Sequence, residues 1–270
     1  MRQRGPTKRG LMAAATEGAK LSIRGAGKRY GDLQAIADVT FDVGHNTIVS
    51  IVGPSGCGKT TLLWSMSGLH GLSEGQVQLD GRTINGPHPD IGLVFQEANL
   101  LPWRNLMQNI LFPWEVKRQK PDMAWIDHLL ERVGLKGFEN RMPRELSGGM
   151  QQRASIVRAL SLRPSVLLMD EPFGALDAFT REEMNRLVEE IWLETKTTIV
   201  FITHSIEEAI FLSDRALVLS KRPGRVMADY SVPFARPRSL ETMASREVFD
   251  LTNRIKADIY GQTTLRSAAE

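Results

Sequence analysis

Cysteine and long hydrophobic runs are almost absent from this sequence. A single cysteine, Cys57, occurs in 270 residues. An intrachain disulfide is therefore excluded, and the cysteine content fits a reducing compartment. The longest apolar runs, such as Ile199–Ile202, have the length of a strand and fall well short of the roughly 18 residues that a transmembrane helix requires. Hydrophobic residues make up 42% of the chain and charged residues 24%, which indicates a globular protein with a substantial core.

An excess of positive charge is confined to the N-terminus. The formal net charge is +3, and residues 1–20 contain five basic residues and one acidic residue, so they carry +4 and the remaining 250 residues carry −1. A nucleic-acid-binding face needs basic residues clustered on the folded domain, so we expect no nucleic-acid partner. We expect residues 1–20 to form a flexible basic leader. The apolar stretch Leu11–Ala15 is shorter than the roughly 7–15 residues of a secretory signal core.

Strand and helix patterns divide the rest of the chain into zones. Residues 21–95 and 164–235 contain short apolar or β-branched runs between glycine-rich and proline-rich turns, and helical segments separate the runs of the later zone. This alternation predicts an α/β core with a parallel sheet. Residues 96–163 show only helical patterns and predict a helical insertion. Residues 236–270 predict a C-terminal helical tail, with one helix at 239–260.

The individual elements follow from the same patterns. The expected strands are Leu33–Val43, Thr47–Val52, Gln76–Leu79, Ile91–Phe95, Val166–Met169, Thr198–Ile202 and Arg215–Leu219. The expected helices are Lys59–Ser67, Asn105–Lys117, Asp122–Val133, Gly149–Ser161, 178–195 and 205–212.

A phosphate-binding loop is the strongest local signal. It matches G-x-x-x-x-G-K-S/T in full, between an expected strand and an expected helix. Backbone N–H groups of such a loop surround an anion, and the helix start adds positive partial charge. Lys59 is expected to bridge terminal phosphates and Thr60 to offer its hydroxyl to Mg²⁺. The expected nucleotide-binding residues here are Gly53, Pro54, Ser55, Gly56, Cys57, Gly58, Lys59, Thr60 and Thr61.

Cys57 allows two interpretations within this loop. The first is that only its backbone amide takes part in phosphate binding. The second is that the positive helix start lowers the pKa of its thiol and makes it sensitive to alkylation.

Two carboxylates follow the apolar run Val166–Met169. Ligands of α/β sheets lie at the carboxyl ends of the strands, so Asp170 is expected beside the phosphate loop, where it would hold Mg²⁺ through water. Glu171 would orient or deprotonate the attacking water. His204 follows another apolar strand and is expected at the same edge, in contact with the γ-phosphate, although a lone histidine also fits a structural role.

A second anion-binding device lies far from the first in sequence. Ser147, Gly148 and Gly149 open an expected helix with bare backbone amides and a capping serine. A P-loop kinase or GTPase with one phosphate site leaves this device without a role. Two copies of the chain arranged head to tail would each close their Ser147–Gly149 segment over the nucleotide of the other, so we expect a nucleotide-sandwich dimer.

These motifs, in this order, resemble the ATP-binding subunits of ABC transporters over about residues 20–235. The resemblance rests on the phosphate loop, on Leu146–Met150 and on the strand that ends at Asp170 and Glu171. It implies an α/β P-loop NTPase core, with a mostly parallel sheet, an antiparallel β part and an inserted α-helical subdomain. It also implies hydrolysis of ATP with Mg²⁺.

The resemblance assigns roles to further residues. Gln96 matches the glutamine that senses Mg²⁺ and the membrane partner, which makes it an expected metal and catalytic residue. Tyr30 matches the aromatic residue that stacks on adenine. Asp177 ends the Gly174–Asp177 motif that matches the family's D-loop, and His204 matches the switch histidine. The implied partners are a second copy, two transmembrane permease subunits and, indirectly, a solute-binding protein, with the chain peripheral on the cytoplasmic face of the cell membrane.

A finer resemblance is to the nitrate, sulfonate and taurine importer branch, and it rests on the segments 86–90, 100–105 and 220–226. It implies import of a small anionic or sulfonate-type solute. An amino-pyrimidine importer of the same branch, or a soluble ABC-type ATPase without a transport role, is the alternative. Trp103 fits either core packing or a docking surface for the membrane subunit. Intact Glu171 and His204 speak against a non-hydrolysing subunit.

Overall fold

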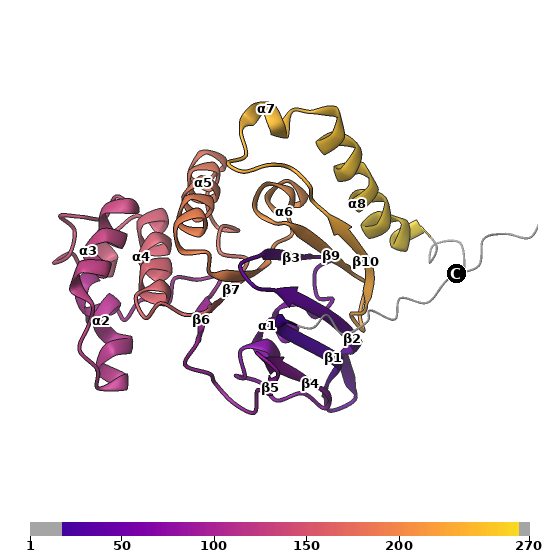
Figure 1. Cartoon of the computed structure of the whole chain (residues 1–270), viewed down its shortest axis with the longest axis horizontal. Helices are drawn as coiled ribbons and strands as arrows, with labels where there is room; N and C mark the ends of the chain where they lie inside the picture. Colours follow the sequence, from indigo (N-terminus) through magenta and orange to yellow (C-terminus); the bar gives the residue numbers. More distant parts are fainter. Residues whose placement is uncertain (1–17, 265–270) are drawn as a thin grey trace, which may run out of the picture.

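Two β-sheets organise the protein, whose computed structural model describes residues 18–264 (Figure 1). The larger sheet contains β3 (Ile48–Val52), β6 (Ile91–Val94), β7 (Val166–Asp170), β8 (Thr198–Ile202), β9 (Arg215–Leu219) and β10 (Val226–Ser231), in the order β10-β9-β3-β8-β7-β6. The smaller sheet contains β1 (Ala19–Tyr30), β2 (Leu33–Gly44), β4 (Glu74–Leu79) and β5 (Arg82–Thr83), in the order β2-β1-β4-β5. Every pairing in the smaller sheet is antiparallel, and in the larger sheet only β10 is antiparallel to its neighbour.

The central strands are apolar along their whole length because both faces of the larger sheet are buried. On β8, Val200 and Ile202 share a core with helix α1 (Lys59–Met66) and the smaller sheet. Ile199 and Phe201 of the same strand point to the opposite face, into a core with helix α5 (Ala178–Thr195). The helix after the phosphate loop is therefore enclosed between the two sheets, and this position fixes the loop rigidly at the end of β3.

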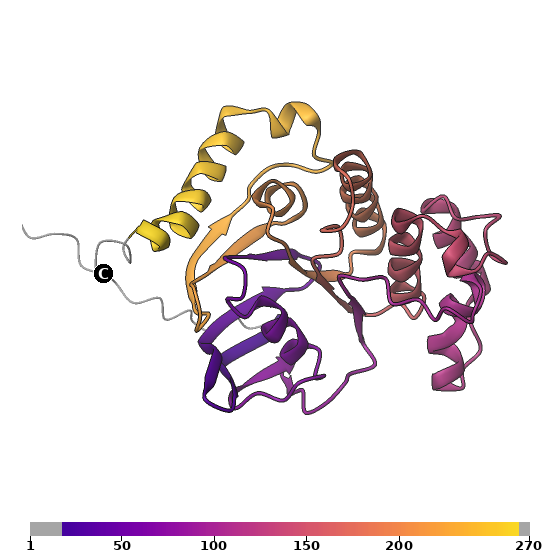
Figure 2. The same cartoon turned by 180° about the vertical axis from the view of Figure 1, so that it is seen from behind.

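The opposite face of the larger sheet is covered by helices from the second half of the chain. Helix α6 (Ile206–Leu212) packs on β3 and β9, and α8 (Arg246–Thr264) packs on α6 and on β9 and β10 (Figure 2). None of the helices within residues 18–264 is both long enough and apolar enough to cross a bilayer.

A helical subdomain lies to one side of the sheets, next to β6 and α5 (Figures 1 and 2). It contains α2 (Leu106–Lys117), α3 (Met123–Arg132), a 3₁₀ turn (Pro143–Glu145) and α4 (Gly148–Leu160). Side chains cap all three α-helices, since Asn105, Asp122 and Ser147 accept backbone N–H bonds at their starts.

Helix α4 also holds the chain segment that leaves β6. Gln152 donates to the carbonyl oxygen of Phe95 at 3.2 Å, and the Arg158 guanidinium donates to the carbonyls of Ala98 and Asn99, each at 2.8 Å. The segment that contains Gln96 is thus attached to the subdomain and not only to the sheet.

Three strands are present that the sequence patterns do not reveal. In β1, register shifts around Gly25 and Gly27 break the alternation that a strand pattern needs. Strand β5 has only two residues, and β10 is half-exposed along its length. Because β1 begins at Ala19, residues 19–20 of the expected leader belong to the sheet, and Lys20 pairs with Asp80 at 2.7 Å. Residues 1–17 of that leader lie outside the described part of the chain.

The single expected helix at 239–260 is interrupted, because α7 (Leu240–Met243) ends before α8 begins at Arg246. The polypeptide leading into α7 is fastened to the core by Arg238, which is 4% exposed. Its backbone N–H donates to the Glu189 carboxylate of α5, and its guanidinium donates to five carbonyl oxygens, those of Ile210, Phe211, Ser213, Val232 and Phe234. This part of the C-terminal tail is consequently integrated into the domain.

Candidate functional site

The phosphate loop leaves the end of β3 and enters α1 through a left-handed residue. Gly58 precedes α1 with a φ of 104°, and a Cβ atom there would lie 2.6 Å from Cγ2 of Ile36 and 2.7 Å from the carbonyl oxygen of Ala35. Only glycine fits this position. No side chain caps the N-terminus of α1, so its first backbone N–H groups are available to an anion. Ser55 and Gly56 are exposed at the turn of the loop, and Thr61 is half-buried in α1.

Lys59 lies folded over this loop and is 6% exposed. Its Nζ donates to the carbonyl oxygens of Gly53 at 3.0 Å and Pro54 at 3.2 Å, and lies 3.9 Å from Oε1 of Glu171. A positive charge is thus held between the loop and the carboxylates at the end of β7. That arrangement suits a bound polyphosphate, whose charge would replace these weak contacts.

The thiol of Cys57 is 1% exposed. Burial raises its pKa, and this effect exceeds the lowering by Lys59 and by the backbone N–H groups. This direction is opposite to the second interpretation and agrees with the first, and the loop itself approaches the sulfur, since a Cβ on Gly53 would lie 3.2 Å from Sγ of Cys57. The Cys57 N–H donates to the Pro54 carbonyl oxygen at 3.3 Å, which shapes the turn.

Asp170 and Thr60 meet beside the loop. The Thr60 hydroxyl donates to Oδ1 of Asp170 at 3.1 Å, and Asp170 is 5% exposed. Burial raises the pKa of Asp170, the Thr60 hydrogen bond opposes this, Glu171 adds to it and Lys59 lowers it. The two oxygens suit Mg²⁺, which prefers oxygen ligands, and the buried carboxylate gains most from a cation. The described residues contain no cluster of three or more His, Cys, Asp or Glu able to hold a metal.

This burial predicts a stability effect for Asp170→Asn. Because the folded-state pKa is raised, the wild-type aspartate binds its proton more tightly folded than unfolded. Folded stability therefore falls as pH rises from the unfolded value of 3.8 through the folded pKa, and stays low above it. Asparagine keeps the acceptor for Thr60 without the charge. We expect the nucleotide-free variant to be about 1 kcal/mol more stable than wild type at pH 7, although it loses the magnesium ligand.

Thermal unfolding in EDTA across pH measures this. The advantage of the variant should disappear below about pH 4, where the wild-type carboxyl is protonated. A variant that is less stable than wild type at pH 7 would contradict the assignment of a destabilising charge. Asp127→Asn, an exposed position on α3, serves as the matched control.

Gln96, Glu171 and His204 converge around Gly174. Nδ1 of His204 lies 3.2 Å from Oε2 of Glu171. A Cβ on Gly174 would lie 3.4 Å from the carbonyl oxygen of Glu171, 3.6 Å from Cε1 of His204 and 3.9 Å from Nε2 of Gln96. Glu171 has a left-handed φ of 42°, which is uncommon outside glycine. The structure therefore brings together the three residues expected to be catalytic.

Tyr30 ends β1 and is 42% exposed. Strand pairing sets it opposite Leu33, two residues before the Ala35 carbonyl that abuts Gly58, so it belongs to the same edge as the phosphate loop. Its hydroxyl lies 2.9 Å from Nδ1 of His70, and Lys28 lies over its ring at 5.1 Å. His70 thus holds the Tyr30 hydroxyl in place. The sequence does not predict this contact, because no motif relates residues 30 and 70.

The second anion-binding device lies on the helical subdomain. Ser147 caps α4 by accepting from the Met150 N–H at 3.3 Å, and Gly148 is exposed. In both views α4 lies in the subdomain and α1 between the sheets, so the two devices belong to different parts of the molecule (Figures 1 and 2).

The first turn of α5, which Asp177 of the D-loop caps, adjoins this second device. A Cβ on Gly149 would lie 2.9 Å from Cγ2 of Thr180. Asp177 caps α5 and accepts from the N–H groups of Phe179 and Thr180 and from the Thr180 hydroxyl. These bonds, first that from the Thr180 N–H, lower the pKa of Asp177. Within one chain, the Asp177 carboxylate is thus engaged by its own helix.

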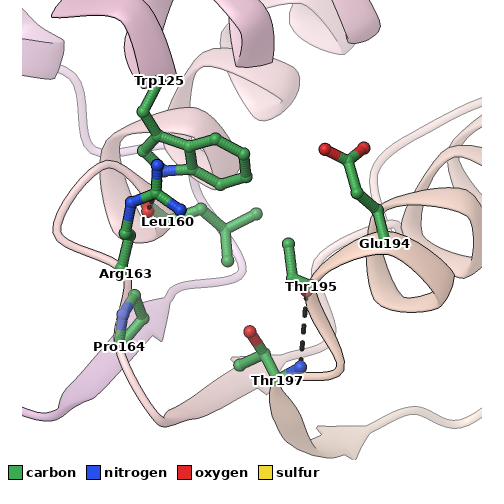
Figure 3. Close-up of a pocket in the computed structure, with 7 residues that line it drawn as sticks. All are labelled: Trp125, Leu160, Arg163, Pro164, Glu194, Thr195 and Thr197. Atoms are coloured by element: carbon green, nitrogen blue, oxygen red, sulfur yellow. Dashed lines mark hydrogen bonds between the residues drawn. The ribbon is translucent and has the colours of Figure 1, made fainter. Parts of the chain in front are cut away.

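A cavity of about 270 Å³ lies elsewhere, between the subdomain and the ends of α5 and β8. Figure 3 shows Arg163 beside the Trp125 ring, with Glu194 across the gap. Its charged groups already have partners, since Arg163 pairs with Asp122 at 3.1 Å and Glu194 lies 2.6 Å from His128. The lining residues are separate from the phosphate loop, so this cavity is not the nucleotide site.

The class of protein follows from this arrangement. The phosphate loop lies between a strand and a helix, and a carboxylate pair lies at the end of a neighbouring strand. An inserted helical subdomain contributes a second anion-binding device. Together these features define a P-loop ATPase of the cassette type.

Comparison with known proteins agrees with that class. Residues 36–174 match the family model for ABC transporters, and the chain belongs to this family. The taurine import ATP-binding protein TauB of Jannaschia sp. is 45% identical over 222 residues, which are 80% of this chain and 83% of the relative. The aliphatic sulfonates import ATP-binding protein SsuB of Bacillus licheniformis is 43% identical over 225 residues, 81% of this chain and 88% of the relative.

Solved structures lead to the same family. The structure of cbiO1 from Clostridium perfringens, part of the ABC transporter complex cbiONQ, has a TM-score of 0.73 at 25% identity and covers 87% of this chain and 95% of that chain. The dimeric structure of MJ0796, a bacterial ABC transporter cassette, has a TM-score of 0.70 at 31% identity, with 80% and 100% covered. The family, the fold class and the ATPase activity expected from the sequence are confirmed.

Proposed function

We propose that this chain energises the import of a small sulfonate-type solute by hydrolysing ATP. The observation that carries the enzymatic part is the convergence of Lys59, Glu171 and His204 at the mouth of the phosphate loop, with His204 3.2 Å and Lys59 3.9 Å from the Glu171 carboxylate. The solute class is supported by relatives named for the import of taurine and of aliphatic sulfonates, which are 43–45% identical.

The triphosphate would lie along the loop, with its charge on the α1 N–H groups and on Lys59. Tyr30 would stack against the adenine ring. Thr60, Asp170 and Gln96 would hold Mg²⁺, which when bound supplies charge neutralisation at the β- and γ-phosphates. Glu171 orients the attacking water and accepts its proton, and His204 donates to the γ-phosphate. Phosphoryl transfer of this kind depends on positioning and on charge stabilisation.

A second copy of the chain would complete the site. Ser147, Gly148 and Gly149 lie on the helical subdomain, in a different part of the molecule from the phosphate loop of the same chain. In a head-to-tail pair, these residues and Asp177 would close over the partner's nucleotide. The dimeric cassette among the solved relatives supports this assembly.

This chain would lie peripherally at the cytoplasmic face of the membrane, bound to two transmembrane permease subunits, and a solute-binding protein would act on it only indirectly, through the permease. Trp103 supports a docking surface, because it follows the segment held by α4 and is 71% exposed. The alternative of core packing for Trp103 is wrong, since so exposed a ring contributes little to a core. Large exposed aromatic side chains are typical of binding surfaces.

A docking role for Trp103 predicts a separable defect. We expect Trp103→Ala to keep the ATPase activity of the isolated chain within about twofold and to lower co-purification with the permease about tenfold or more. Phe249→Ala is the matched control, because Phe249 is 62% exposed on α8. Equal permease recovery for both variants would remove Trp103 from the interface.

The solute class is tested with the assembled transporter. The complex is reconstituted in vesicles with its solute-binding protein, and ATP turnover is measured with taurine, alkanesulfonates, nitrate or an amino-pyrimidine. We expect taurine or an alkanesulfonate to stimulate turnover and to stabilise the binding protein against heat. Stimulation by an amino-pyrimidine alone would overturn the sulfonate assignment and leave the ATPase assignment standing.

A further inference from the structure

An ion pair between the partly exposed Arg181 and the buried Glu208 connects the two segments that contact Glu171. The first segment, 173–177, follows Glu171 and begins α5. Arg181, one turn into α5, donates through Nε to the Phe173 carbonyl oxygen at 3.3 Å and through Nη2 to the Leu176 carbonyl oxygen at 2.8 Å. Its guanidinium therefore holds the backbone of the D-loop in one shape.

The second segment, 203–205, contains His204 and begins α6. Thr203 is 1% exposed, and its hydroxyl accepts from the Ser205 N–H at 2.9 Å and donates to Oε2 of Glu208 at 2.5 Å. Glu208 is 7% exposed and fixes the backbone on both sides of His204 through this one hydroxyl.

Glu208 also forms an ion pair with Arg181, and this pair connects the two segments. Nε of Arg181 lies 3.4 Å from Oε1 of Glu208. Both connected segments contact Glu171 directly, since the Gly174 N–H donates to its carbonyl oxygen at 3.1 Å and His204 lies beside its carboxylate. The Arg181–Glu208 pair consequently connects the D-loop to His204. The D-loop faces the second copy in the proposed dimer, and His204 is expected at the γ-phosphate.

We propose that Arg181 and Glu208 are positioning residues that couple closure of the D-loop against a second copy to the placement of His204 and Glu171. This inference rests on the proposed function. Movement of the D-loop carbonyls is transmitted through the guanidinium to Glu208 and through Thr203 to the backbone of His204. Neither residue touches the nucleotide, so their loss affects the chemical step rather than ATP binding.

The test compares Glu208→Gln with Glu207→Gln. Glutamine at 208 retains an acceptor for the Thr203 hydroxyl and removes the charge that Arg181 faces. Glu207 is its neighbour on α6, lies 3.6 Å from Lys256 at the surface and serves as the control. We expect Glu208→Gln to lower kcat about tenfold to a hundredfold, since small misplacements of reacting groups have effects of this size. KM for ATP, nucleotide affinity and the control's kcat should stay within about twofold.

A double substitution separates coupling from simple damage. Arg181→Gln and Glu208→Gln should each lower kcat, and the double variant should be no slower than the worse single variant, because both break one connection. A Glu208→Gln variant with wild-type kcat, or losses of kcat that multiply in the double variant, would overturn the inference. A loss of kcat accompanied by equal losses of thermal stability and ATP affinity would also overturn it, as a purely structural effect.

Failure of the proposed function looks different. A wild-type chain that hydrolyses no ATP, with or without its permease, would refute the proposed function before any variant is compared. Wild-type turnover with an unaffected Glu208→Gln would refute only the coupling.

Discussion

Replacing Glu171 with glutamine should leave ATP binding intact and lower turnover about a hundredfold to a thousandfold, the range that removal of a general base produces. Glutamine keeps the size of the side chain and its place beside His204, but it does not accept the proton of the attacking water. The left-handed backbone at Glu171 is tolerated by both residues, so the fold should be preserved.

The same substitution should change the oligomeric state. With ATP bound and hydrolysis blocked, two copies would remain closed over two nucleotides, and Glu171→Gln should accumulate as a dimer in size-exclusion chromatography with ATP and Mg²⁺. The measurement uses the purified chain, alone and with its permease. Glu182→Gln, a partly exposed position on α5 where the side chain pairs with Arg186, is the control and should turn over ATP like wild type.

Two outcomes would contradict this assignment. Wild-type turnover in Glu171→Gln would show that another group accepts the proton. A strictly monomeric variant in ATP, even beside the permease, would contradict the shared nucleotide site, because each copy would then have to complete the pocket alone.

The sequence predicts the parts of this site that are contiguous. The phosphate loop is one run of eight residues, and the close approach of β2 requires a glycine at Gly58, so pattern and structure coincide there. The same holds for Asp170 and Glu171, which end a strand buried on both faces. His204 follows another parallel strand, and the rule that ligands bind at the carboxyl ends of such strands predicts its position beside Glu171 without any knowledge of side-chain contacts.

Features that depend on distant packing were not predictable. The pKa of Cys57 is raised because segments remote in sequence cover the thiol, while the local pattern shows only a helix start. Arg181 and Glu208 look like ordinary surface charges of two helices, and their pairing appears only once α5 and α6 lie side by side. Strand β1 was missed because its pairing with two neighbours, and not its own alternation, makes it a strand.

Removing the Lys59 side chain should abolish most nucleotide affinity. In Lys59→Ala we expect the Kd for ATP to rise about a hundredfold, corresponding to loss of charge-assisted hydrogen bonds worth about 3 kcal/mol. The alanine leaves the α1 N–H groups in place but removes the buried cation between loop and carboxylates. Asp170 and Glu171 would then repel the phosphates without compensation.

Fluorescent ATP-analogue titration measures this, and thermal unfolding without nucleotide shows that the variant is folded. Lys117→Ala is the matched control, because Lys117 lies in the last turn of α2 and donates to the Pro89 carbonyl oxygen at 3.3 Å, outside the loop. Unchanged ATP affinity in Lys59→Ala would mean that the loop does not hold the triphosphate. Adding Asp170→Asn to Lys59→Ala should recover part of the lost affinity for magnesium-free ATP, since the repelling carboxylate is then neutral, and a further loss there would contradict the electrostatic account.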